Sequence, residues 1–148
     1  MKKIKLYLDN CCFNRPFDDQ NHYKIYLETE AKLFIQRKIL EGYYDLVWSF
    51  ILDYENSANP DIDIKNTINK WEKISKETIL LSDDILHYSR RLNILGFGIK
   101  DSLHIACAIK ANADYFLTVD RSIINKRNRI SDITILNLLE FIDLEEDK

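Results

Sequence analysis

Short apolar runs that alternate with helical segments constrain the fold of this chain more than any other feature. Three runs have the length of strands, 3–8, 44–48 and 115–119, and shorter ones lie at 78–81 and 133–136. The run at 115–119 is apolar on both faces, as strands of a buried parallel sheet are. Strands that alternate with helices indicate such a sheet with helices on both faces. We therefore predict an α/β fold, a three-layer α/β/α sandwich with a central, mostly parallel sheet.

The segments between these runs carry helical signals. Apolar residues recur near helical spacing from Ile25 to Leu40, and Gly42 follows where a C-cap glycine is expected. Ser49 and Ser82 are each placed to open a helix, the second running to Leu95. Further helices are predicted at 61–76, 101–112, 121–128 and 137–144, and a turn-rich loop at 10–21.

Length and hydropathy indicate one domain without a membrane segment. The 148 residues fit a single domain, 1–148, that can bury a sizeable core. The longest apolar run is far shorter than the roughly 20 residues of a membrane span. The basic N-terminus lacks the apolar region and cleavage site of a signal peptide. We expect a cytoplasmic protein that does not associate with membranes.

Charge and cysteine content exclude some classes of function. The net charge of −3 argues against binding nucleic acid through a basic surface alone, although bound divalent ions supply local positive charge. Three cysteines without a CxxC pair, and only three histidines, make a disulfide framework or structural zinc site improbable. Residues 121–130 contain four basic residues and no acid, which fits a solvated helix face or a surface that contacts phosphate.

Four acidic residues are placed to meet at one edge of the predicted sheet. Asp9 and Asp120 each end an apolar run, Asp101 opens a predicted helix, and Glu55 follows the run at 44–52. The carboxyl ends of the strands in an open α/β sheet form one edge, where ligands bind. Taken singly, the four acids are explained as well by turn formation, helix capping or a solvated helix face.

A cluster of these four carboxylates would have a defined chemistry. Two like charges 4 Å apart repel by about 4 kcal/mol at an effective dielectric of 20, so a cluster calls for a cation. Mg²⁺ and Mn²⁺ prefer carboxylate and water oxygens. Such ions activate water and neutralise a leaving oxygen in phosphodiester hydrolysis. The pattern therefore predicts a metal-dependent phosphodiester hydrolase.

The acidic residues and their contexts resemble a known family. The order Asp9, Glu55, Asp101, Asp120 resembles the acidic signature of PIN-domain ribonucleases, which include the toxins of VapBC toxin–antitoxin systems. The matching strings are LYLD at 6–9, SFILDYE at 49–55, KDSLHIA at 100–106 and FLTVD at 116–120. The segment 9–20 is similar to one bacterial subgroup, and the resemblance spans essentially the whole chain.

This resemblance implies an α/β/α sandwich that cleaves single-stranded or structured RNA with Mg²⁺ or Mn²⁺ as cofactor. It implies that the four acids bind the metal and that Thr118, two residues before the last acid, belongs to the catalytic site. It also implies an antitoxin protein as partner and a possible homodimer. The chain departs from the family pattern at Asn10 and Cys11 and in a longer polar loop after the first strand.

Four further residues are candidates for substrate binding, each with a second explanation. His104 can hydrogen-bond an acid or shuttle a proton, or pack for structural reasons. Arg15 can grip a phosphate or pair with Asp18 or Asp19. Asn10 can orient Asp9 or form a turn, and Arg121 begins the basic stretch.

A non-catalytic PIN-like domain that binds protein or RNA is the alternative function. Its site would be degenerate, whereas all four acids are intact in this sequence.

Overall fold

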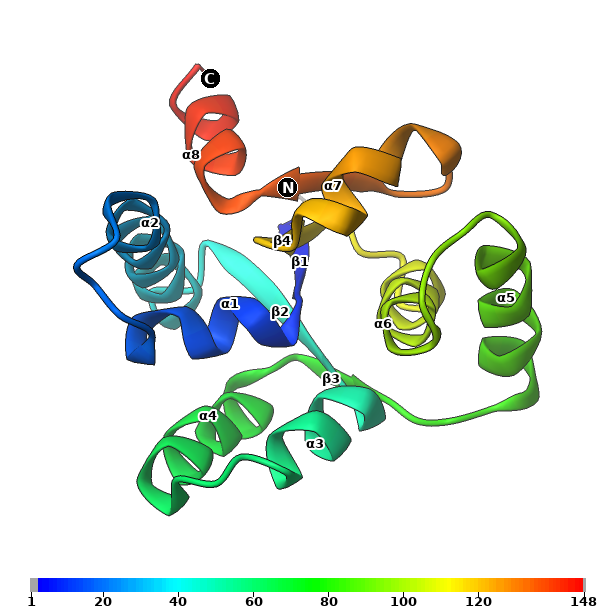
Figure 1. Ribbon diagram of the computed structural model, residues 1–148, viewed down its shortest axis with the longest axis horizontal. Helices are drawn as coiled ribbons and strands as arrows, with labels where there is room; N and C mark the ends of the chain where they lie inside the picture. Colours follow the sequence, from blue (N-terminus) through cyan, green and yellow to red (C-terminus); the bar gives the residue numbers. More distant parts are fainter. Residues whose placement is uncertain (1–2, 148) are drawn as a thin grey trace.

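A five-stranded, wholly parallel sheet forms the centre of the computed structural model, which describes residues 3–147 (Figure 1). The strand order is β3-β2-β1-β4-β5, so the first strand lies in the middle. The strands are β1 (Ile4–Leu8), β2 (Tyr44–Ser49), β3 (Glu77–Ile79), β4 (Tyr115–Thr118) and β5 (Thr134–Asn137). This confirms the predicted α/β class. The sheet is wholly parallel, whereas we predicted a mostly parallel one.

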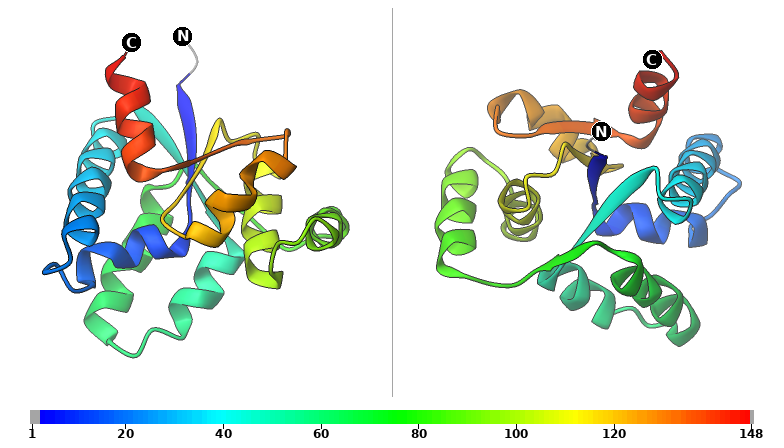
Figure 2. Two further views of the ribbon diagram at one scale, coloured as in Figure 1. Left: turned by 45° about the horizontal axis from the view of Figure 1, so that its top comes forward. Right: turned by 180° about the vertical axis from the view of Figure 1, so that it is seen from behind.

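Helices cover both faces of the sheet. Helices α2 and α8 lie on one face, whereas α6 lies on the other with α5 packed outside it (Figures 1 and 2). The α-helices are α1 (Asn10–Asn14), α2 (Tyr23–Leu40), α3 (Phe50–Ser57), α4 (Ile62–Ile74), α5 (Asp83–Ile94), α6 (Ile99–Lys110), α7 (Arg121–Lys126) and α8 (Leu138–Glu146). Two 3₁₀ helices are η1 (Arg15–Phe17) and η2 (Arg127–Arg129). The three layers are those predicted from the sequence.

The central strands are buried on both faces. In β1, Leu6 and Tyr7 are fully buried, and Tyr7 stands in register with Val47 of β2 and Phe116 of β4. Burying a side chain of this size stabilises the fold by about 1.5–3 kcal/mol. The middle of the sheet is therefore rigid, and residues at its carboxyl end are held by a well-packed base.

Predicted helix boundaries are confirmed at several caps. The Ser49 hydroxyl accepts a hydrogen bond from the Leu52 N–H, and the Ser82 hydroxyl accepts one from Ile85. Gly42 has φ of +86°, the left-handed conformation that favours glycine after a helix. Apart from the segment after β1, element ends differ from the prediction by at most two residues.

The segment after β1 is not the turn-rich loop that we predicted. It begins with α1, because the Asp9 side chain accepts a hydrogen bond from the Asn10 N–H and caps this helix. Pro16 then lies in the first turn of η1, where its missing N–H has no cost. Helix α6 also begins before Asp101, with Gly98 as its N-cap, so Asp101 lies inside the first turn.

In the described part of the chain, no helix combines the length and apolar character required to cross a bilayer.

Candidate active site

Asp9 is held at the carboxyl end of the middle strand by three hydrogen bonds. Its backbone N–H donates to the Leu117 carbonyl at 2.9 Å and extends the β1–β4 ladder. Its side chain accepts from the Asn10 N–H at 2.8 Å and from the Thr118 hydroxyl at 2.8 Å. Only 5% of the residue is exposed. A carboxylate in this position is fixed by the fold rather than free to move.

Thr118 joins the ends of β1 and β4. Its buried hydroxyl donates to Asp9 and accepts from the Asp120 N–H at 3.0 Å. The Cys11 thiol lies 3.4 Å from Asp9 Oδ2 and 3.5 Å from the Thr118 hydroxyl. Thr118 thus sets the separation of the two aspartates that end neighbouring strands.

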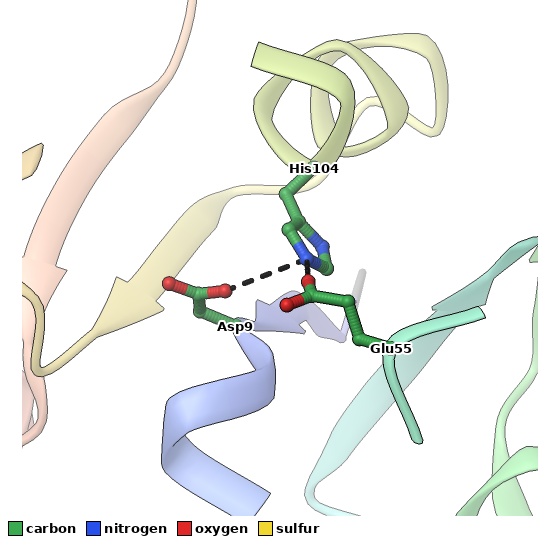
Figure 3. Close-up of side chains that lie close together, drawn as sticks. All are labelled: Asp9, Glu55 and His104. Atoms are coloured by element: carbon green, nitrogen blue, oxygen red, sulfur yellow. Dashed lines mark hydrogen bonds and ion pairs between the residues drawn. The ribbon is translucent and has the colours of Figure 1, made fainter. Parts of the chain in front are cut away.

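Glu55 and His104 approach Asp9 from two helices on different sides of the site (Figure 3). The His104 Nε2 forms a hydrogen bond with Glu55 Oε1 and lies 3.7 Å from Asp9 Oδ1. Asp9, Glu55 and His104 each offer one atom that could bind a metal, and these three atoms lie within 4.8 Å of one another. The side chain of His104 is 1% exposed and that of Glu55 is 21% exposed. The cluster therefore opens to solvent mainly on the Glu55 side.

A buried chain of hydroxyl groups orients His104. The Tyr7 hydroxyl lies 2.6 Å from His104 Nδ1 and 2.6 Å from the Ser49 hydroxyl. Burial raises the pKa of Tyr7 well above its ordinary value, so the phenol keeps its hydrogen. An imidazole that accepts this hydrogen on Nδ1 carries its own on Nε2, directed at Glu55. This network therefore fixes the ring that contacts the acids.

Asp101 lies half-buried in the first turn of α6, within the field of the other acids. Its pKa is raised to about 6, first by burial and then by Asp9 and Asp120, with His104 opposing and Glu55 adding to the shift. The other three acids therefore act on Asp101 through their charge. Among the described residues, the compact group within 4.8 Å contains Asp9, Glu55 and His104, and Asp101 and Asp120 lie outside it.

Asp120 caps α7, where its Oδ1 accepts from the Ser122 N–H at 2.8 Å. Helix capping, which the sequence offered as an alternative role for Asp101, is wrong for that residue, because Gly98 is the N-cap of α6. Asp120 and Asp9, for which the sequence offered turn formation, are the residues that cap helices. Capping uses one oxygen of each carboxylate and does not move either away from the site. The structural and the functional explanation are compatible at both positions.

The donor set fits a divalent cation. Among residues 3–147, no lysine or arginine forms an ion pair with Asp9, Glu55, Asp101 or Asp120. Carboxylate oxygens are the ligands that Mg²⁺ and Mn²⁺ prefer. Half-buried negative charge without a protein cation is the environment in which such an ion stabilises a fold.

The remaining sequence candidates are placed differently. Asn10 begins α1 beside Asp9, and its buried Oδ1 has no hydrogen-bond partner among the described residues. Arg15 pairs with Asp18 at 2.9 Å, one of the two partners predicted, and also lies 3.3 Å from Glu28. Arg121 is exposed at the start of α7, immediately after Asp120.

Sequence reasoning did not identify Tyr7 and Ser49 as parts of the site. Tyr7 lies two residues before Asp9 and therefore on the same face of the strand, a signal that could have found it. Ser49 was predicted only as a helix cap, and its hydroxyl serves the cap and the tyrosine together. Trp48 and Trp71 are buried in the core.

Comparison with known proteins supports the fold. No family model matches the sequence, and no curated protein is detectably related to it. Solved structures do match, with 17% identity in each of two cases. VapBC-1 from nontypeable Haemophilus influenzae has a TM-score of 0.57 over 92% of this chain and 99% of that chain.

The second structure is VapBC2 from Rickettsia felis bound to a DNA fragment from their promoter. It has a TM-score of 0.55 over 90% of this chain and 98% of that chain. Likeness at this level of identity carries the fold and leaves the chemistry to be argued from the residues. For the fold, the resemblance noted in the sequence is confirmed, because the chain has the PIN-domain fold and is similar in structure to these VapBC proteins.

Proposed function

We propose that this protein is a metal-dependent endoribonuclease that cleaves phosphodiester bonds in single-stranded or structured RNA. One observation carries the proposal. Carboxylates from separate elements meet at the carboxyl edge of a PIN-fold sheet, and no lysine or arginine among the described residues pairs with them. Isolated structural acids do not gather in this way, because their mutual repulsion lowers stability.

Asp9, Glu55, Asp101 and Asp120 are the residues that would hold Mg²⁺ or Mn²⁺. A bound ion of this kind supplies positive charge at the scissile phosphate and makes an attacking water more acidic. His104 keeps Glu55 directed into the site through its Nε2. Thr118 holds Asp9 and the backbone of Asp120 at a fixed separation, which is the role that we assign to it in catalysis.

The partners and cellular setting follow from the same proposal. The similar solved structures are VapBC assemblies, and we infer by analogy that an antitoxin protein inhibits this chain. A homodimer is the assembly that the family resemblance implies. All three cysteines are free, which fits a protein acting in the reducing cytoplasm.

The test is cleavage of single-stranded and structured RNAs with Mg²⁺ or Mn²⁺ by the wild type and by Asp9→Asn. Asp84→Asn is the matched control, because Asp84 is exposed on α5 and, among residues 3–147, forms an ion pair with Lys110 alone. We expect the wild type and the control to cut and Asp9→Asn not to cut. Equal cutting by all three proteins would point to a contaminant or another active centre.

The alternative, a non-catalytic domain that binds protein or RNA, predicts a different outcome. Such a protein would show no cleavage under any metal, and Mn²⁺ would not raise its melting temperature. The intact acidic cluster favours the enzyme over this alternative.

A further inference from the structure

We propose that a pocket beside the acidic cluster, between α2, α7 and the start of α8, binds a phosphate of the RNA strand through Lys24 and Arg121. This inference rests on the proposed ribonuclease function and adds the substrate contacts that the acids lack. The pocket has a volume of 270 Å³. It is lined by Lys24, Glu28, Val119, Arg121, Ile124, Asn125 and Asn137.

The structure separates the four basic residues of the segment 121–130 into two groups. Arg127 forms two hydrogen bonds with Glu140, at 2.7 and 3.0 Å. Lys126 and Arg129 each donate at 2.8 Å to a backbone carbonyl in the connection between α5 and α6. These three cations hold the fold together. Arg121 is exposed and forms no ion pair or hydrogen bond through its side chain among residues 3–147, so its charge is available to a ligand.

Lys24 provides a second available charge from another element. It lies exposed in the first turn of α2 and, within the described residues, has no side-chain partner. Lys24 and Arg121 come from distant parts of the sequence and line the same pocket. Asn125 is exposed on the same wall and offers an amide donor and acceptor. Two cations and an amide form a polar site suited to a phosphodiester.

The carboxylate of Glu28 lies near three cations, Arg15, Lys24 and Arg121, and does not cancel the positive charge of the pocket. This buried carboxylate lies 3.3 Å from Arg15 Nε, and Arg15 also pairs with Asp18. Burial raises the pKa of Glu28, while Arg15, Lys24 and Arg121 lower it, so all three cations lie within its field. Lys24 and Arg121 together exceed the single carboxylate of Glu28 among the residues that line the pocket, so the lining keeps a net positive charge.

The pocket adjoins the acids through the end of β4. Val119 lines the pocket, Asp120 follows it, and Arg121 is the next residue. The Val119 N–H lies 3.5 Å from the Cys11 sulfur, which contacts Asp9 Oδ2. We infer that a strand of RNA with one phosphate at the acids places another of its phosphates in the pocket. Positive charge next to a cluster of carboxylates also reduces their repulsion of the substrate.

The experiment measures binding of a fluorescent single-stranded RNA oligonucleotide by anisotropy at several salt concentrations. Asp101→Asn with Mg²⁺ is the background, so that the RNA is not cut. The test variants are Lys24→Gln, Arg121→Gln and both together. The controls are Lys73→Gln and Arg90→Gln, which remove exposed charges from α4 and α5 that have no ion pair in the described chain. Melting temperatures establish that every variant is folded.

We expect the double variant to bind RNA about 10-fold more weakly and the controls to bind as the background does. The slope of log K against log salt should fall by about 1.4, because each lost contact to single-stranded RNA contributes about 0.7. Equal slopes in the double variant and the controls, or no RNA binding by the background protein, would overturn the inference. Polyglutamate binding with the same dependence on Arg121 would also overturn it, in favour of a protein-docking site.

Failure of the inference is distinguishable from failure of the proposed function. If the wild type cleaves RNA while the double variant keeps its affinity, salt slope and cleavage rate, the nuclease stands and the pocket does not. If the slope changes as expected but the wild type cuts no RNA with Mg²⁺ or Mn²⁺, the pocket binds RNA in a protein that is not a nuclease.

Discussion

The amino-terminal end of the sheet pairs its charged side chains, whereas at the carboxyl-terminal end no lysine or arginine of residues 3–147 pairs with the acids. At the amino end, Lys5 Nζ lies 2.8 Å from Glu77 and donates to the Ala111 carbonyl, while its backbone N–H donates to Asp114. At the carboxyl end, Asp9 is buried and Asp101 half-buried, and within the described residues neither forms an ion pair with a lysine or arginine. The difference indicates that one end serves stability and the other accepts reduced stability for binding a cation.

Asp101→Asn should produce the largest effect, because it removes a charge from the unpaired end. We expect cleavage to fall by at least about 100-fold, the loss of roughly 2.7 kcal/mol of transition-state stabilisation. In chelator, the same change should raise the melting temperature at pH 7. Cleavage assays and thermal melts measure the two effects, with Asp84→Asn as control.

The pH dependence of the metal-free protein tests the same asymmetry. The pKa of folded Asp101, raised to about 6, exceeds its ordinary value, so the folded state binds the proton more tightly than the unfolded state. Its contribution to stability is therefore lost as pH rises through 4 to 6. Asp101→Asn should remove the part of this loss of stability that the Asp101 carboxyl group causes. Identical slopes for wild type and variant in chelator would contradict clustering of the acids.

Lys32→Met sharpens the comparison at a buried charge that belongs neither to the acidic cluster nor to the lining of the pocket. Lys32 donates to Gln36 at 2.6 Å and lies over the rings of Phe13 and Trp71. Burial lowers its pKa to about 8, so below that pH the folded state carries the full cost of the charged amine. We expect the free energy of unfolding of the variant to exceed that of the wild type by about 2 kcal/mol at pH 7.

That gain should shrink as pH rises from 8 toward the ordinary lysine pKa, where the amine is neutral in the folded state. Denaturant unfolding at pH 7 and pH 9.5 measures the change. A gain that is the same at both values would show that apolar packing, and not the charge, accounts for it. Lys73→Met on the exposed face of α4 is the control.

Tyr7→Phe tests whether the hydroxyl network orients the acids. The change leaves His104 Nδ1 and the Ser49 hydroxyl without their shared partner. We expect affinity for Mn²⁺ to fall about 10-fold, as for other residues that support a metal ligand. Calorimetric titration measures the affinity. The control is Tyr115→Phe, because the Tyr115 hydroxyl forms no hydrogen bond among residues 3–147. Equal affinities in the two variants would leave Tyr7 a purely structural residue.

Lys5→Met at the amino end should have the smallest effect. It breaks a partly exposed ion pair with Glu77 and one bond to a carbonyl, together worth about 1 kcal/mol. Cleavage should not change, since Lys5 lies at the opposite end of β1 from Asp9. Loss of activity in a folded Lys5→Met protein would mean that the two ends are coupled.

Most of the fold could be predicted because the strands and their caps are local signals. The apolar run that begins at Tyr115 identifies a strand, and the caps Ser49 and Ser82 identify the starts of two helices. These signals can be read without knowledge of contacts between distant residues. Helix α1 could not be found, because it depends on Asp9, which the sequence presents equally well as a turn former.

The acids of the site could be predicted from their positions, but their supporting contacts could not. The bond of Tyr7 to His104 joins residues 97 apart in sequence, and no local pattern specifies it. The same holds for Lys24 and Arg121, which meet only because α2 and α7 border one pocket. Short-range patterns give the candidate ligands, whereas the groups that orient them come from tertiary packing.

The most direct test of the central claim is a Mn²⁺ titration of thermal stability with the wild type and Asp9→Asn. If the carboxyl end binds a divalent cation, an ion at 100 times its dissociation constant should stabilise the wild type by ~2.7 kcal/mol and Asp9→Asn far less. An unchanged melting temperature of the wild type at millimolar Mn²⁺ would contradict the account.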